Sequence, residues 1–107
     1  MSTFDDREKA FEAKFAHDEA LTFKAHARRN RALGIWAAEK LGLNPEETDA
    51  YVRTLIEVDL EEAGSEDVYR RLKADFDAKN IDMSEHRLRR TMDELLADAV
   101  KSVREQG

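Results

Sequence analysis

The chain contains no cysteine, only one proline and only four glycines. The absence of cysteine excludes disulfides, thiolate metal sites and thiol nucleophiles, and it fits a reducing cytosol. The scarcity of proline and glycine leaves few points at which helices must end. The fold must therefore be stabilised by side-chain packing, and we expect long helices.

Long apolar runs are also absent. The sequence has no stretch of about 18 apolar residues that could cross a bilayer, and residues 1–6 lack the basic and apolar regions of a secretory signal. We therefore expect a cytoplasmic protein that does not insert directly into a membrane.

The 107 residues are 41% hydrophobic and 39% charged, with a formal net charge of -6. This length is that of one domain. The composition is typical of amphipathic helices, in which charge covers every face except the buried one. The net negative charge opposes nucleic-acid binding, so we expect no nucleic-acid partner.

The few glycine and proline residues mark the first helix boundary. A helix is predicted from about residue 3 to residue 41, where Gly42 can take the left-handed C' position and Leu43 can pack behind it. Asn44, Pro45 and Glu47 then have the spacing of an N-cap, a first helical residue and the third residue of a capping box.

Three further helices follow, each with apolar residues at three- and four-residue spacing. The second should end near Ala63-Gly64, and Ser65 should cap the third, which closes at Lys79-Asn80. Asp82 or Ser84 can cap the last. The predicted buried stripes are Tyr51, Val52, Leu55, Ile56 and Leu60; then Val68, Leu72 and Phe76; then Leu88, Met92, Leu95, Leu96, Ala99 and Val103.

Four helices with short connections predict an all-α four-helix bundle. The first helix would be roughly 57 Å long, whereas its partners would reach only about 20 to 35 Å. About half of it has no neighbour, so we expect its N-terminal half to project from the bundle. The predicted division is residues 1–19 as an N-terminal binding segment and 20–107 as the bundle domain.

Phenylalanine marks the projecting half. Phe4, Phe11 and Phe15 share a narrow stripe at about 100° per residue, and Leu33, Trp36 and Ala37 share the same side further along. Polar residues separate the two groups on this side: Asp18, Thr22, His26 and Arg29. This gap indicates two segments with different roles.

Two interpretations of the phenylalanine stripe stay open, core packing and partner binding. The length mismatch favours helix-in-groove recognition, with the phenylalanines as anchors and the neighbouring charges setting orientation. Those charges are Asp5, Asp6, Arg7, Glu8, Lys9, Glu12 and Lys14. A free segment of this length is marginally helical and can fold on its partner.

No acidic residue lies between Glu19 and Glu39, yet this stretch carries Lys24, Arg28, Arg29 and Arg31. The stretch is either a solvated face that answers the acidic run from Glu57 to Asp67, or an anion site, since arginine grips phosphates. The chain has no glycine-rich phosphate loop, and Trp36 is expected in the core.

No catalytic or metal-binding constellation is predicted. His17, His26 and His86 are far apart and share no metal-ligand spacing with the carboxylates, and no serine lies in a nucleophile motif. We expect a protein that binds a partner, is not an enzyme and requires no cofactor.

Two runs carry a resemblance to a known family, residues 4–18 (FDDREKAFEAKFAHD) and 23–31 (FKAHARRNR), continued by 33–38 (LGIWAA) and 65–72 (SEDVYRRL). They resemble the zeta-subunit inhibitors of alphaproteobacterial F-type ATP synthase. The resemblance covers nearly the whole chain, although the last helix matches mainly in its pattern.

The resemblance implies a four-helix subunit, peripheral to the membrane-bound ATP synthase, whose N-terminal segment inserts at a catalytic interface of the F1 sector. There it meets the alpha, beta and gamma subunits and stops ATP hydrolysis. The candidate F1-binding residues are Phe4, Asp5, Asp6, Arg7, Phe11, Lys14 and Phe15.

The family resemblance also implies ADP or ATP as a regulatory ligand. Candidate contacts are Lys24, Arg28, Arg29 and Arg31. The alternative functions are an adenine-nucleotide-responsive helical regulator that acts on another partner, and a small nucleic-acid-binding protein, which the net charge opposes.

Overall fold

The structure is a computed structural model that describes the backbone of residues 3–61 and 65–106 and the side chains of 20–61 and 65–105. Over these residues the chain forms four α-helices and no β-strand. The helices are α1 (Thr3–Leu41), α2 (Pro45–Glu61), α3 (Glu66–Ala78) and α4 (Glu85–Gln106). The predicted all-α class is confirmed. None of the described helices is long and apolar enough to cross a membrane.

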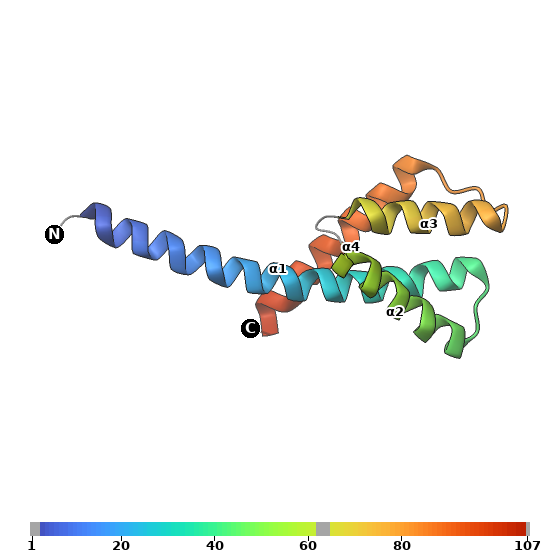
Figure 1. Ribbon diagram of the computed structural model, residues 1–107, viewed down its shortest axis with the longest axis horizontal. Coiled ribbons are helices and arrows are strands. Elements are labelled where there is room, and N and C mark those ends of the chain that lie inside the picture. Colours follow the sequence, from blue (N-terminus) through green and yellow to red (C-terminus); the bar gives the residue numbers. More distant parts are fainter. Residues whose placement is uncertain (1–2, 62–64, 107) are drawn as a thin grey trace.

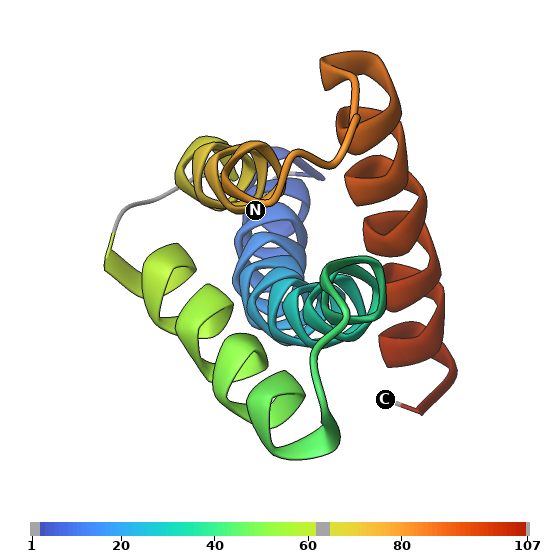
Figure 2. The ribbon, with the colours of Figure 1, turned by 90° about the vertical axis from the view of Figure 1, so that its right-hand side faces the viewer.

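Each helix runs in the opposite direction to the one before it (Figure 1). Viewed along the long axis, α1 lies between α2 and α4, and α3 lies on one side of it (Figure 2). α1 packs on α2 and α4, and α3 packs on the same two helices from the other side. This is the four-helix arrangement that the short connections predict.

The helices differ greatly in length. α1 has 39 residues, against 17, 13 and 22 for α2, α3 and α4. At a rise of 1.5 Å per residue, α1 is about 58 Å long and its partners are about 20 to 33 Å. The molecule measures 63 Å along its longest axis, but 25 and 22 Å across. The N-terminal half of α1 therefore projects beyond the other helices, as predicted (Figure 1).

The C-terminus of α1 is closed by a Schellman motif. Gly42 has a φ of 74°. Its N–H donates to the carbonyl of Glu39 at 3.3 Å, and the N–H of Leu43 donates to the carbonyl of Ala38 at 3.0 Å. These bonds satisfy carbonyls that the helix leaves open at its end. The predicted boundary at Gly42 is confirmed.

A capping box begins α2 immediately afterwards. The side-chain oxygen of Asn44 accepts from the N–H of Glu47 at 2.8 Å, and the N–H of Asn44 donates to the Glu47 carboxylate at 3.0 Å. Pro45 is the first helical residue, where its missing N–H costs nothing. The chain therefore reverses between α1 and α2 through local bonds alone.

The start of α3 differs from the prediction. Ser65 occupies the N-cap position, but its side chain makes no capping hydrogen bond. The Ser65 backbone has a φ of -94° and a ψ of 2°, away from the extended geometry of a capping residue. The expected hydroxyl cap was wrong. The predicted end of α2, near Ala63-Gly64, lies outside the described residues.

The connection from α3 to α4 follows the sequence closely. Asn80 takes a left-handed φ of 58°, and the N–H of Ile81 donates to the carbonyl of Phe76 at 2.9 Å. Of the two candidate caps for α4, Ser84 makes the bond, since its hydroxyl accepts from the N–H of Arg87 at 3.1 Å. Asparagine tolerates this left-handed position better than most residues.

The main core is shared by all four helices and the loop before α4. Trp36 meets Phe76 edge to face, with ring centroids 5.8 Å apart. The apolar stripes predicted for α3 and α4 are buried or half-buried, but Leu60 of the α2 stripe is 64% exposed, so that part of the prediction was wrong. The buried members are Leu33, Ala37, Leu41, Leu55, Val68, Tyr69, Leu72, Phe76, Met83, Leu88 and Met92.

A second, smaller apolar cluster lies where α1 leaves the bundle. Ala25 of α1 is buried against Ala99 and Val103 of α4. Leu21, Leu96 and Val100 pack around these residues and are partly buried. The last turns of α4 therefore hold α1 just after its projecting half.

α1 and α2 approach each other closely at Gly34. A Cβ built at this residue would lie 2.8 Å from Cγ2 and 3.0 Å from Cα of Val52. Alanine at position 34 would gain about 1 kcal/mol of helix propensity, but overpacking costs about 1 to 3 kcal/mol and backbone cannot move aside cheaply. We expect Gly34→Ala to lower the free energy of unfolding by about 1 kcal/mol, measured by urea denaturation, with Ala50→Gly as an exposed control. A Gly34→Ala protein more stable than wild type would contradict this close packing.

Candidate functional site

A polar cluster joins α1 and α2 at the base of the projecting half. The Asn30 amide donates to the Asp59 carboxylate at 2.8 Å, and Nε of Arg29 donates to the Asn30 side-chain oxygen at 2.7 Å. Nη2 of Arg29 lies 3.9 Å from Asp59, and Nδ1 of His26 lies 3.6 Å from the same carboxylate. Asp59 of α2 therefore lies within 4 Å of three polar residues on one side of α1.

Arg29 and Asn30 are both buried, each only 1% exposed. Burial lowers the pKa of the Arg29 guanidinium, and the carboxylates of Asp59 and Asp93 oppose that shift. The guanidinium stays charged at neutral pH because its ordinary pKa is so high. A buried charge is tolerated only when it is paired, so Asp59 is the residue that permits Arg29 to lie inside the bundle.

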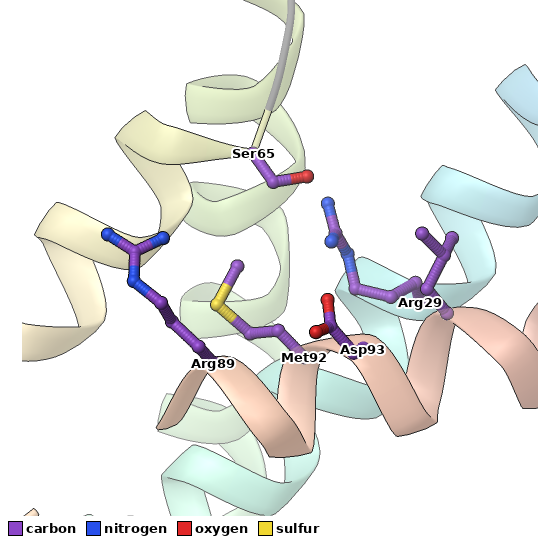
Figure 3. A pocket seen from close by; sticks show the side chains of 6 residues that line it. Arg29, Ser65, Arg89, Met92 and Asp93 are labelled. Atoms are coloured by element: carbon purple, nitrogen blue, oxygen red, sulfur yellow. The ribbon is translucent and has the colours of Figure 1, made fainter. Parts of the chain in front are cut away.

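A small cavity lies beside Arg29, between the base of α1, the start of α3 and the middle of α4. Its volume is about 170 Å³, and the lining residues are Arg29, Ser65, Arg89, Met92, Asp93 and Leu96. The Arg29 guanidinium and the Ser65 hydroxyl point toward the same space (Figure 3). Nη2 of Arg29 makes no hydrogen bond with any described residue. The volume is below the range of about 300 to 1,000 Å³ that holds most ligands, so a phosphate-sized group is the largest that fits.

Arg89, on the other side of the cavity, is already engaged. It makes two hydrogen bonds to the Glu66 carboxylate, at 2.8 and 3.1 Å, and one to Glu85 at 3.0 Å. Its guanidinium also lies 3.9 Å from the centre of the Tyr69 ring. Arg89 is therefore already paired, and the remaining polar side chains that line the cavity are those of Arg29, Ser65 and Asp93.

The structure separates the four cations predicted to bind a nucleotide. Arg29 is inside the bundle, whereas Lys24, Arg28 and Arg31 are exposed. Arg28 donates to the Ser102 hydroxyl of α4 at 2.6 Å. The lining of the cavity includes Arg29 but not the other three. The alternative interpretation was that this basic stretch pairs with the acidic run from Glu57 to Asp67. Arg29 does pair with Asp59, but Glu66 of the same run pairs with Arg89 of α4.

Sequence reasoning missed the burial of Arg29 and Asn30 as a pair. The signal was present, because Arg29 shares one side of the helix with Leu33 and Trp36, both core positions. The F1-binding candidates at the N-terminus, from Phe4 to Phe15, have side chains outside the described residues, although the backbone there is helical. Among the described residues no group of three or more metal-ligating side chains comes together.

These features define a helical bundle protein in which one long helix projects from the bundle and is anchored at its base by buried contacts. The family model of ATPase inhibitor subunit zeta matches residues 1–102. A structure determined by NMR in solution is 38% identical, with a TM-score of 0.68, and the match covers 81% of this chain and 99% of that chain. No curated protein matches the chain. The chain belongs to the ATPase inhibitor subunit zeta family.

The polar cluster yields a stability prediction. Asp59→Ala would leave Arg29 buried without its carboxylate, and breaking a buried pair costs about 3 kcal/mol or more. Arg29→Met, which removes the buried charge itself, should cost about 1 kcal/mol or less on the same grounds. Urea denaturation measures both, with the exposed Glu57→Ala as control. If Asp59→Ala costs no more than Glu57→Ala, the cluster does not hold α2 to α1.

Proposed function

We propose that this protein inhibits ATP hydrolysis by inserting the N-terminal segment of α1, residues 3–19, at a catalytic interface of the F1 sector of ATP synthase. The segment meets the alpha, beta and gamma subunits there, on the cytoplasmic side of the membrane. The observation that carries this proposal is the projecting half of α1, which extends beyond the helices of its own bundle (Figure 1). Membership of an inhibitor family supports it.

The segment has the features of a helix that binds in a groove of a partner protein. Its 17 helical positions span about 25 Å at 1.5 Å per residue. Phe4, Phe11 and Phe15 fall within about 40° of one another at 100° per residue, the spacing of anchors on one helix face. Asp5, Arg7 and Lys14 lie on the two sides of this stripe, whereas Asp6 lies about 160° from its middle, and all four supply charge for orientation. Aromatic anchors dominate the binding energy of such interfaces.

The base of α1 makes this segment a better ligand than a free peptide. A helix of this length alone is marginal in water because nucleation is costly. Here the following turns are already fixed by Asp59 on the α2 side and by Ala99 and Val103 on the α4 side. The bundle therefore nucleates the helix and fixes its direction, which lowers the entropy cost of binding.

A second candidate function is regulation by ADP or ATP. It rests on the Arg29 guanidinium, which lines the cavity and whose Nη2 is buried without a hydrogen-bond partner among the described residues. A nucleotide phosphate can accept from this group and from the Ser65 hydroxyl, and Lys24, Arg28 and Arg31 would take no direct part. Such a ligand changes inhibition only if the protein has two conformations that differ in the position of the N-terminal segment, and the ligand binds one of them more tightly.

We expect removal of residues 1–19 to abolish inhibition of ATP hydrolysis by purified F1. Replacing Phe4, Phe11 and Phe15 together by alanine should do the same, because about 1 to 3 kcal/mol is lost at each anchor. The thermal unfolding of the bundle should stay unchanged in both proteins. His17→Ala, at a residue on the opposite side of the segment, should inhibit like wild type. Full inhibition by the truncated protein would contradict the proposed function.

Nucleotide regulation predicts that titration with ADP shifts the backbone amide resonances around Arg29 and Ser65, and that Ser65→Ala weakens this binding. Ser102→Ala, which removes a hydroxyl bonded to Arg28 outside the cavity, is the matched control. Amide shifts that spare this region at millimolar ADP would exclude the second candidate.

A further inference from the structure

One face of α1 within the bundle has no helix over it. α3 lies on one side of α1, α2 and α4 flank it, and the side turned away from α3 is open (Figure 2). At about 100° per residue, Lys24, Arg28, Arg31 and Ile35 lie on this open side, within about 60° of one another. We call these four residues, together with Leu60 of α2, the outer face.

The outer face holds two of the three large apolar side chains that are exposed among the described residues, Ile35 and Leu60. Phe23 is 65% exposed, Leu60 64% and Ile35 48%. Phe23 lies on the α2 side of α1, but Ile35 and Leu60 lie on the side of two adjacent helices that is turned away from α3. Apolar side chains grouped in this way are typical of a surface that another protein covers.

The packing of α2 on α1 places Leu60 with the others. Gly34 meets Val52, and Asn30 bonds Asp59, so the two helices run antiparallel in a fixed register. Leu60 directly follows Asp59 and therefore lies beside the turn of α1 that precedes Asn30. It also lies about 180° around α2 from Tyr51, which bonds Asp75 of α3, so it is on the side turned away from α3. The Leu60 exposure is thus a consequence of register and not of a frayed helix end.

The outer face is also basic in an acidic chain. Lys24 and Arg31 are exposed and make no ion pair or side-chain hydrogen bond with other described residues, although the chain carries a net charge of -6. α1 has no acidic residue between Glu19 and Glu39 to neutralise them. With Arg28 the outer face carries three cations, too few for a membrane surface, which takes clusters of about 4 to 8, or for nucleic acid. Cations mixed with apolar side chains match an acidic and partly apolar protein surface.

We propose that the outer face is a second docking surface of this protein on the ATP synthase head, where it contacts an acidic, partly apolar surface next to the point at which residues 3–19 insert. This inference rests on the proposed function. It adds a contact that acts at the same time as the phenylalanine stripe.

The geometry of a continuous helix fixes the two contacts relative to each other. Lys24, Arg31 and Ile35 lie about 160 to 200° around the helix axis from Phe15. The phenylalanine stripe and the outer face therefore look in opposite directions, at different depths along α1. A partner that contacts both must bind the helix from two opposite sides. An interface between two subunits can do this, whereas a groove on one subunit cannot.

Charge reversal tests the outer face directly. Lys24→Glu with Arg31→Glu should slow association with F1 about tenfold at low ionic strength, and the difference should shrink as salt screens the charges. Arg87→Glu with Lys101→Glu makes the same charge change at exposed positions of α4 and is the matched control. Inhibition of ATP hydrolysis is measured for both at about 20 and 300 mM KCl. Equal inhibition by the two double variants would overturn the proposal.

A helix insertion tests the coupling of the two contacts. One alanine added after Ala20 keeps the helix but rotates residues 3–19 by about 100° relative to the outer face. We expect this protein to inhibit at least tenfold more weakly than wild type, whereas a segment that bound alone would be unaffected. Unchanged inhibition by the insertion protein would overturn the proposal.

The failure of this inference is distinguishable from failure of the proposed function. If removal of residues 1–19 leaves inhibition intact, the proposed function fails. If removal abolishes inhibition but the outer-face variants inhibit like the control, only the second docking surface fails. A loss of self-association, or of binding to anionic phosphatidylserine vesicles, with unchanged inhibition would assign the outer face to a second copy or to a membrane and would also overturn it.

Discussion

The rise of an α-helix, 1.5 Å per residue, is the constraint on which this molecule depends. A helix of 39 residues cannot be covered by partners of 13 to 22 residues, so α1 must serve both as a wall of the core and as a projecting arm. Nothing between Thr3 and Leu41 interrupts it: the segment has no proline, and its one glycine is Gly34. The projecting arm and the part of α1 inside the bundle are therefore one continuous helical rod, and the position of the bundle fixes the direction of the arm.

The polar cluster around Asp59 lies at the point where this rod leaves the bundle. A buried ion pair is weak evidence for stability, because desolvation offsets much of its attraction. Its geometric effect is stronger, since Arg29 and Asn30 can satisfy their polar groups only when Asp59 is opposite them. The close approach of Gly34 to Val52 sets the same register one turn further along. α2 thus has one position on α1, and this position leaves Leu60 outside.

A rigid base explains how a bundle of this size can assist binding at a distance. The second apolar cluster, of Ala25 with Ala99 and Val103, holds α1 from the α4 side, while the main core is two to three turns away. An inhibitor whose binding helix is already formed loses less conformational entropy on binding than a disordered peptide does. The bundle also brings the outer face to a fixed distance and angle from the arm. Binding at both places would then act as one event with high effective concentration.

The sequence by itself determined the four helices, the caps at Gly42 and Asn44, the main apolar stripes and the projecting half of α1. It left Asp82 and Ser84 as alternative caps for α4, and the structure has Ser84. These are local properties, since periodicity, capping chemistry and helix rise depend on neighbours within a few residues. The resemblance of residues 4–18 and 23–31 also indicated the family. Only the tertiary structure decided that Arg29 lies inside while Lys24 and Arg31 lie outside, that Leu60 is exposed, and that Ser65 does not cap. Each of these depends on which helix lies opposite and in which register, and α2 and α4 approach α1 from parts of the chain about 30 to 75 residues away in sequence.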